Sequence, residues 1–179
     1  IPVTIGGGII NLERAIDCFK NGADKVALNS SVRNNKDIVS QIVNHFGSQS
    51  VVASVDYKII NGEAWVYDWN HKKAIQGLDI KSYLNLLIEL EFGEILLNSV
   101  DKDGTGFGFD IDTFKKVSSN CSQPLIAMGG AGKYEHFIDL YNSVDVDAAA
   151  TANLLNFISN AIPNARMNLL QEGIKLAKF

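Results

Sequence analysis

The sequence predicts an α/β fold, an incomplete (β/α)8 barrel of the TIM type in which strands three to eight are present. Three observations point to it: apolar runs alternate with amphipathic stretches along all 179 residues, a glycine-rich turn follows an apolar run twice, and six strands are expected where a closed barrel needs eight. Alternation also fits a doubly wound sheet, but neither Gly6-Gly7-Gly8 nor Gly129-Gly130-Ala131-Gly132 has the Rossmann G-x-G-x-x-G spacing. We therefore expect one partial barrel domain over residues 1–179, with two βα units missing before Ile1.

The expected strands are continuous apolar runs, which are typical of parallel strands buried on both faces. They are Val3–Ile5, Lys25–Asn29, Val51–Asp56, Ile95–Ser99, Leu125–Met128 and Ala148–Ala152. Helices are expected between them because apolar residues recur there at helical spacing and capping residues precede several of the stripes. These stripes are Leu12–Phe19 after Asn11, Ile38–Phe46 before Gly47, Tyr83–Leu90 after Asp79, Phe114–Val117 after Asp110, Phe137–Tyr141 and Met167–Lys178.

One segment, residues 57–77, departs from this alternation. Asn61-Gly62 is a strong hairpin turn signal, and the apolar runs Lys58–Ile60 and Ala64–Tyr67 flank it. The pattern predicts a β-hairpin inserted after a barrel strand and followed by a basic loop, His71-Lys72-Lys73.

Composition narrows the class of function. Hydrophobic residues make up 46% and charged residues 20% of the chain, as in a folded globular protein, and the net charge is −4. The sequence has no stripe of Lys and Arg residues, which argues against nucleic acid as the main partner. No apolar run is long enough for a membrane span. The two cysteines, Cys18 and Cys121, lack metal-ligand spacing and fit a reducing compartment, so we expect a cytoplasmic protein without a metal or cofactor.

The duplicated glycine turn suggests the kind of ligand. Gly6 and Asp24 are eighteen positions apart, and so are Gly129 and Asp147. A strand that ends in Gly-Gly before a helix leaves backbone N–H groups free to hold an anion. Two such units suggest a substrate with a phosphate at each end.

Barrel chemistry is expected at the carboxyl ends of the strands, where Asp56 closes the run Val51–Asp56. A lone carboxylate there is a candidate general acid or base, although it could also pair with Lys58 or cap a loop. The loop Asp101–Gly106 resembles a calcium site in its alternate carboxylates, but its twelfth position is Asp112 instead of glutamate, so a phosphate loop or an ordinary tight loop fits better. The three histidines, His45, His71 and His136, are expected on helices or the inserted loop, and none is assigned to catalysis.

With these residues identified, the chain resembles the cyclase subunit of imidazole glycerol phosphate synthase, of the histidine biosynthesis family. The resemblance covers nearly the whole chain. It rests on Val3–Gly8, Gly22–Val26, Phe46–Gln49, Val51–Asp56, Gly93–Leu97, Asp101–Thr105, and Gly129–Gly132 with Glu135–Phe137.

The resemblance implies a lyase reaction in which ammonia from a glutaminase partner crosses the barrel and reacts with a ribulose-bearing bisphosphate. The products would be imidazole glycerol phosphate and an aminoimidazole carboxamide ribotide. Asp56 matches one catalytic aspartate of the family; the other belongs to the first barrel strand. The implied binding roles group as follows: phosphate and substrate at Gly8, Asn29, Ser30, Asn98, Asp103, Gly104, Gly130, Ala131 and Asn153; ammonia gate at Lys25 and Glu94; glutaminase interface at Asp24.

Three positions depart from the family pattern. Asn98 replaces a threonine, Met128 a serine before the second glycine turn, and Asn153 a phosphate-binding serine. These changes resemble a paralogous branch that works with its own amidotransferase on surface-polysaccharide sugars. Two alternatives therefore stay open beside the histidine pathway: that paralogue, and a non-catalytic barrel fragment that only binds the glutaminase.

Overall fold

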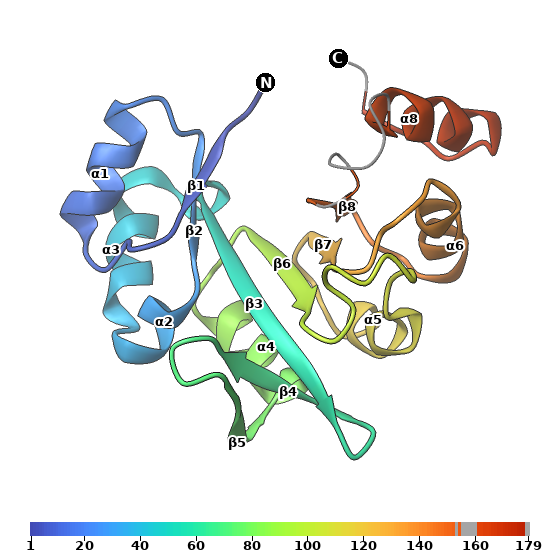
Figure 1. The fold of residues 1–179 in the computed structure, drawn as a ribbon. Coiled ribbons are helices and arrows are strands. Elements are labelled where there is room, and N and C mark those ends of the chain that lie inside the picture. Colours follow the sequence, from blue (N-terminus) through green and yellow to red (C-terminus); the bar gives the residue numbers. More distant parts are fainter. Residues whose placement is uncertain (153, 155–160, 178–179) are drawn as a thin grey trace.

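The computed structural model describes residues 1–152, 154 and 161–177, and it forms a curled, mostly parallel sheet with helices on its outer face (Figure 1). The strand order along the sheet is β1-β2-β3-β6-β7-β8, and β4 and β5 extend from β3 as an antiparallel hairpin. This is the α/β half-barrel that the sequence predicts. The elements in chain order are β1 Thr4–Gly6, α1 Leu12–Lys20, β2 Lys25–Leu28, α2 Ser30–Asn34, α3 Asp37–Phe46, a 3₁₀ turn Ser48–Ser50, β3 Val51–Ile60, β4 Glu63–Asp68, β5 Lys73–Asp79, α4 Ile80–Glu89, β6 Glu94–Ser99, α5 Ile111–Ser118, β7 Leu125–Met128, α6 Glu135–Ser143, β8 Ala148–Ala150 and α8 Ala161–Gln171.

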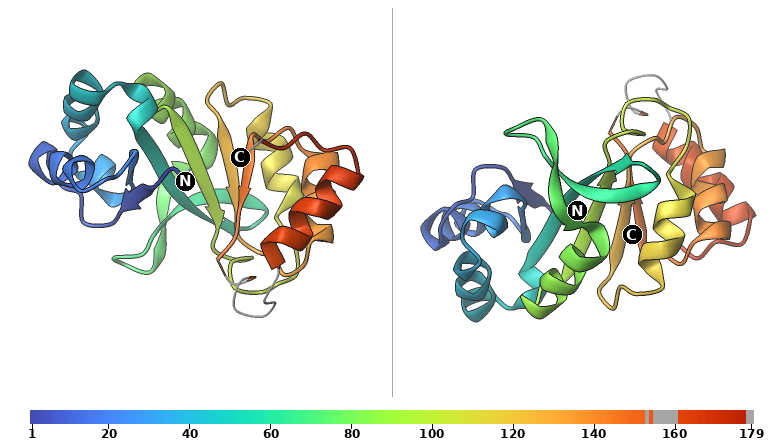
Figure 2. Two further views of the ribbon diagram at one scale, coloured as in Figure 1. Left: turned by 90° about the horizontal axis from the view of Figure 1, so that it is seen from above. Right: turned by 90° about the horizontal axis from the view of Figure 1, so that it is seen from below.

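The helices pack around the outside of the sheet in the order of the chain. Seen from above and below, α1–α3 lie at one side, α5, α6 and α8 lie at the other, and α4 lies between them (Figure 2). The predicted caps are present: Asn11, Asp79 and Asp110 each accept a hydrogen bond from the backbone N–H three residues later. These caps set where α1, α4 and α5 begin, and the caps of α1 and α5 thereby limit the loops after β1 and β6.

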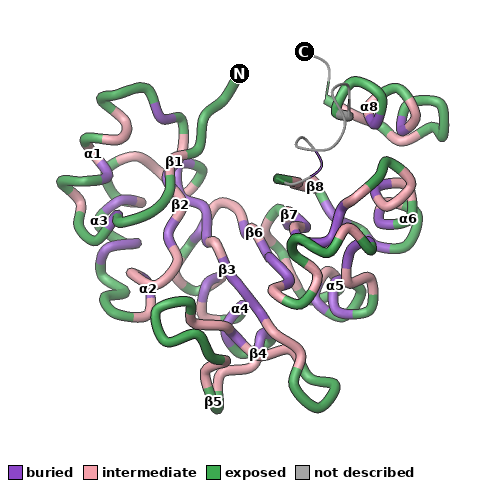
Figure 3. The backbone as a smooth tube through the Cα atoms, viewed as in Figure 1, coloured by how far each residue is buried: buried purple, intermediate pink, exposed green. Residues whose placement is uncertain are grey.

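The two faces of the sheet differ in burial because side chains alternate along each strand. The outward row, which includes Val26, Val55, Ile95 and Leu97, is almost fully covered by the helices. Figure 3 shows mostly buried residues along β3 and β6 and exposed residues in the loops. The inward row is more polar. Strand register aligns Asp56 with Asn98 on this row.

The hairpin differs from the prediction in two ways. The expected strand ends at Asp56, but β3 continues without a break to Ile60, pairing with β6 up to Tyr57 and with β4 from Tyr57 onward. The expected basic loop is shorter, because Lys73 already begins β5, a third strand that was not predicted. Sequence alone misses β5 because it is an edge strand with little alternation and an internal glycine, Gly77. The Asn61-Gly62 turn is confirmed, with φ of 53° and 83°.

Two helical assignments were also incomplete. The short helix α2, directly after Asn29, was not predicted, since five residues carry too little periodicity. The last helix lies earlier than the predicted Met167–Lys178: α8 begins at Ala161 and ends at Gln171, close to Gly173, whose φ of 78° is unfavourable for continuing a helix. Asn153 lies outside the described residues. No helix in the described part of the chain is long and apolar enough to cross a membrane.

Candidate active site

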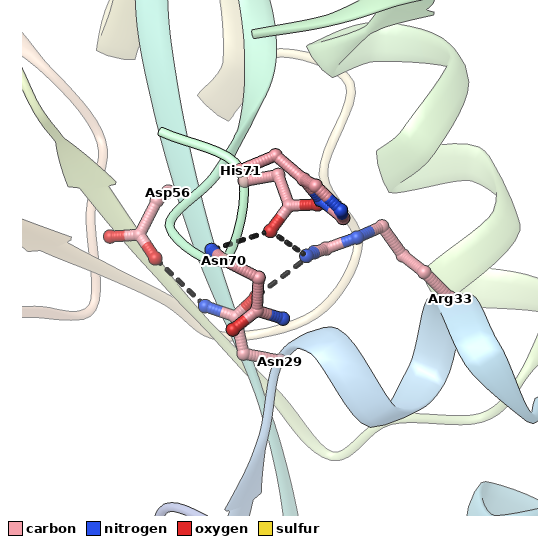
Figure 4. Close-up of polar contacts among 6 residues, drawn as sticks. Asn29, Arg33, Asp56, Asn70 and His71 are labelled. Atoms are coloured by element: carbon pink, nitrogen blue, oxygen red, sulfur yellow. Dashed lines mark hydrogen bonds and ion pairs between the residues drawn. The ribbon is translucent and has the colours of Figure 1, made fainter. Parts of the chain in front are cut away.

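Asp56 lies at the carboxyl end of the barrel portion of β3, where amides from both neighbouring strands hold it. Asn29, which follows β2, donates from Nδ2 to Asp56 Oδ2 at 2.8 Å, and Asn98 on β6 donates from Nδ2 to Oδ1 at 2.9 Å. Asp56 is 8% exposed, so these two bonds fix the plane of a nearly buried carboxylate; Figure 4 shows the bond from Asn29. The alternative pairing with Lys58 does not occur, because Lys58 bonds to Asp101 instead.

Asn98 also faces the second glycine turn. It is 8% exposed, and its Oδ1 has no hydrogen-bond partner within the residues the structure describes. A Cβ on Gly129 would come within 2.9 Å of that oxygen. Glycine at position 129 therefore leaves room for Asn98 to reach Asp56.

The first glycine turn is open. Gly7 and Gly8 have φ of 97° and 67°, and apart from its chain neighbours no atom of the described residues lies within 4 Å of where a Gly7 Cβ would be. The turn lines a cavity of about 330 Å³ together with Asn29, Ser30 and Ser54. The structure thus brings Gly8, Asn29 and Ser30 into one pocket, and Asn29 links that pocket directly to Asp56.

The second glycine turn is closely packed by the loop that follows β6. A Cβ on Gly130 would lie 2.1 Å from the carbonyl oxygen of Gly108, and one on Gly132 would lie 2.4 Å from that of Gly106. The Gly108 N–H donates to the Gly130 carbonyl at 2.8 Å. Close backbone approach is therefore a sufficient reason for these glycines, and Gly130 and Ala131 are buried.

The loop after β6 starts at the same rim as Asp56. The Asp103 N–H donates to the Ser99 carbonyl at 2.8 Å, and Gly104 has a φ of 76°. Asp101 accepts from Lys58 and from the Ile59 N–H; burial raises the pKa of Asp101, but these bonds outweigh it and lower that pKa overall. Asp101 thus ties the loop to β3, while Asp103 and Gly104 are exposed at its tip.

The opposite end of the inward row carries an ion pair. Lys25 begins β2, Glu94 begins β6, and their side chains bond to each other across β3. From Glu94 to Asn98 is four residues, or about 13 Å along the strand. The predicted gate residues therefore meet, at the end of the sheet away from Asp56.

Asp24 lies at that same end and has a structural partner. Its Oδ2 accepts the Val3 N–H at 2.7 Å, and Asp147 accepts the Leu125 N–H at 2.8 Å in the same way. Each carboxylate joins the loop before one strand to the start of the preceding strand. The eighteen-residue repeat seen in the sequence thus includes a duplicated structural bond.

Sequence reasoning did not single out Arg33 or Arg14, which lie near the site, and it assigned His136 no catalytic role. Arg33 donates to Asn29 Oδ1 at 3.0 Å (Figure 4), and Arg14 Nη1 lies 4.0 Å from where a Gly8 Cβ would be. His136 Nδ1 accepts the Gly132 N–H at 3.1 Å, and burial, with the charge of Lys133, lowers the pKa of His136. The spacing Asn29-x-x-x-Arg33 is helical and would have been a signal, had α2 been recognised.

Parallel strands wrapped by helices, with polar side chains gathered at the carboxyl ends, define the class of (β/α)-barrel enzymes. Within that class the chain belongs to the histidine biosynthesis protein family, whose model matches residues 1–159. It is similar to proteins named imidazole glycerol phosphate synthase subunit HisF. That of Chlorobaculum parvum is 40% identical over 174 residues, covering 97% of this chain and 69% of the relative. That of Chloroherpeton thalassium is 37% identical over 176 residues, covering 98% and 70%.

Proposed function

We propose that this chain is the cyclase subunit of imidazole glycerol phosphate synthase, a lyase of histidine biosynthesis. The family match and relatives at 37–40% identity over nearly the whole chain support this activity. The observation that carries the catalytic role is the carboxylate of Asp56, which two amides hold at the carboxyl end of the barrel strands.

In this proposal Asp56 moves protons while ammonia condenses with the ribulosyl part of a bisphosphate substrate. A general acid or base needs a fixed orientation and an accessible face. The hydrogen bonds from the Asn29 and Asn98 side-chain amides fix the orientation of Asp56 without bringing a cation to its carboxylate. Ammonia would pass the Lys25–Glu94 pair and travel along the inward row toward Asp56.

The two phosphates would occupy opposite sides of Asp56. The open pocket of Gly8, Asn29 and Ser30 fits the first phosphate in its size and its backbone geometry. The other half of the substrate would contact the exposed tip of the loop after β6, and the second glycine turn, in which Gly130 and Ala131 are buried, would hold that loop in place. The residues assigned to that half are Asn98, Asp103, Gly104, Gly130, Ala131 and Asn153.

The proposed partner is a glutaminase subunit that docks at the end of the sheet carrying Lys25 and Glu94. Asp24 lies at that end and is exposed, so it could contact a partner with the carboxylate oxygen that does not bind Val3. The proposed compartment is the cytoplasm, where the two cysteines stay reduced.

The test uses the natural full-length protein that contains these residues, with ammonium salt and the ribulosyl bisphosphate. Asp56→Asn should lower kcat about 10²-fold or more with little change in KM, because it removes the acid/base group and keeps the shape. Asp37→Asn, on the exposed start of α3, is the matched control. Near-normal turnover of Asp56→Asn would refute its catalytic role, and an inactive wild-type protein would favour the paralogue or the non-catalytic fragment.

A further inference from the structure

A chain of polar contacts runs from Asp56 to the inserted hairpin. Asn29 Nδ2 donates to Asp56, and Asn29 Oδ1 in turn accepts from Arg33 Nη1 at 3.0 Å. Arg33 Nη2 lies 3.5 Å from Asp68 Oδ1 at the end of β4, and Asp68 Oδ2 lies 2.8 Å from His71 Nδ1. Figure 4 shows Asn29 between the carboxylate and the guanidinium, with the hairpin loop above them.

The orientation of the Asn29 amide matters for Asp56. An asparagine side chain presents an acceptor on one side and a donor on the other. Arg33 has only donors, so the side of Asn29 that faces it must be Oδ1, and Nδ2 then faces Asp56. The positive charge of Arg33 and the negative charge of Asp56 both favour this orientation of the amide. Each charge also polarises the amide so that its hydrogen bond to the other residue becomes stronger.

Arg33 is itself held in place. The side chains of Arg33 and Asp68 are each only 14% exposed, unlike a typical surface ion pair. The hydrogen bond with His71, then that from the Asn70 N–H and the charge of Arg33, lower the pKa of Asp68 and keep it ionised. Arg33 also lies near Tyr83 of α4. Burial raises the pKa of Tyr83, and the charge of Arg33 and a hydrogen bond to it offset part of that rise. Three elements, α2, β4 and α4, therefore surround the guanidinium.

We propose that Arg33 is a positioning residue for Asp56: it sets the Asn29 amide so that Nδ2 donates to the carboxylate, and Asp68 of the hairpin holds Arg33 for that task. Placing the cation one amide away has a chemical advantage. An arginine bonded directly to Asp56 would stabilise the ionised carboxylate and make Asp56 a weaker base. A neutral amide orients the carboxylate with a much smaller loss of basicity. The inserted hairpin then supports the catalytic carboxylate as well as extending the sheet.

The inference rests on the proposed function, and a double-mutant cycle tests it in the natural full-length protein. Arg33→Met should lower kcat about tenfold with KM unchanged, because misplacing a catalytic group affects the transition state more than binding. Arg33→Lys should recover part of the loss. In an Asn29→Ala background, Arg33→Met should cause no further loss, since Arg33 acts through Asn29. Lys36→Met, which removes an exposed neighbouring cation, is the control and should leave kcat unchanged.

A second measurement does not depend on activity. The Asn29 side-chain amide resonances in a ¹⁵N spectrum, assigned by their loss in Asn29→Ala, should shift in Arg33→Met and stay in place in Lys36→Met. Additive losses of kcat in the double variant, a rise in KM alone, or unchanged Asn29 resonances would each overturn the inference. An inactive wild-type protein would count against the proposed function only, because the resonance shifts still decide the role of Arg33.

Discussion

Replacing one glycine in each of the two turns should separate the energetic cost of the backbone conformation from the cost of close packing. Gly7 and Gly130 have almost the same φ, 97° and 100°, so an alanine at either position meets a similar conformational penalty. That penalty is roughly 1–2 kcal/mol for a non-glycine residue in the left-handed region. The surroundings differ completely, since a Cβ at Gly7 has open space and one at Gly130 would lie 2.1 Å from the Gly108 carbonyl oxygen.

The difference between the two variants can be worked out from these contacts. Gly7→Ala should lower the free energy of unfolding by about 1 kcal/mol, the conformational penalty less the loss of unfolded-state freedom. Gly130→Ala adds overpacking against backbone, roughly 1–3 kcal/mol, and strains the hydrogen bond from the Gly108 N–H to the Gly130 carbonyl, about 1 kcal/mol. We therefore expect Gly130→Ala to cost about 2–4 kcal/mol more than Gly7→Ala.

Urea unfolding followed by circular dichroism measures this difference as a shift of midpoint at constant slope. The natural full-length protein should be used for both variants and the wild type. Equal losses in the two variants would refute the packing role of the second turn. A large loss in Gly7→Ala alone would show that the first turn is not open as described.

Two further perturbations test individual bonds. Tyr57 is fully buried and donates to Asp110 Oδ2 at 2.9 Å; burial, then the charge of Asp110, raises its pKa far above the usual 10.0. As pH rises, the Tyr57 hydroxyl therefore loses its proton in the unfolded chain before it does so in the folded protein, and the free energy of unfolding should fall above about pH 10. Tyr57→Phe should flatten that fall in a series of unfolding measurements from about pH 8 to 11. Asp79 caps α4, and its bonds from the Ser82 hydroxyl and N–H lower its pKa. Asp79→Ala should cost about 1 kcal/mol near pH 7. This gap should begin to narrow below about pH 4, where the unfolded carboxylate is protonated, and close only below the lowered pKa of the folded protein. Asp79→Asn should keep part of the cap at both ends of this range, and a pH-independent gap would contradict the reasoning.

The candidate site was predictable where its signals are local. Asp56 was found because it is a carboxylate that follows a buried apolar run, and Gly8 because glycines follow a strand. The pairing of Asn29 and Asn98 with Asp56 could not be predicted in the same way. It depends on the register between β2, β3 and β6, which joins residues up to 42 positions apart.

The repeat shows how one pattern can serve different purposes. The sequence pattern predicts two equivalent anion-binding turns, and the glycines of both turns do have similar φ angles. Only the structure shows that Gly7 borders an open pocket while Gly130 lies against Gly108. Neighbouring loops make this difference, and nothing within either turn encodes it.

The alternation of strands and helices, the helix caps, the hairpin turn and the position of Asp56 can be predicted from the sequence, because each follows from periodicity or from turn chemistry within a few residues. Which side chains meet follows from the three-dimensional arrangement: Lys25 bonds to Glu94, Asn98 to Asp56, and Arg33 to both Asn29 and Asp68. Those contacts depend on the curl of the sheet and on how the hairpin folds back over α2, and such long-range geometry leaves no periodic trace along the chain.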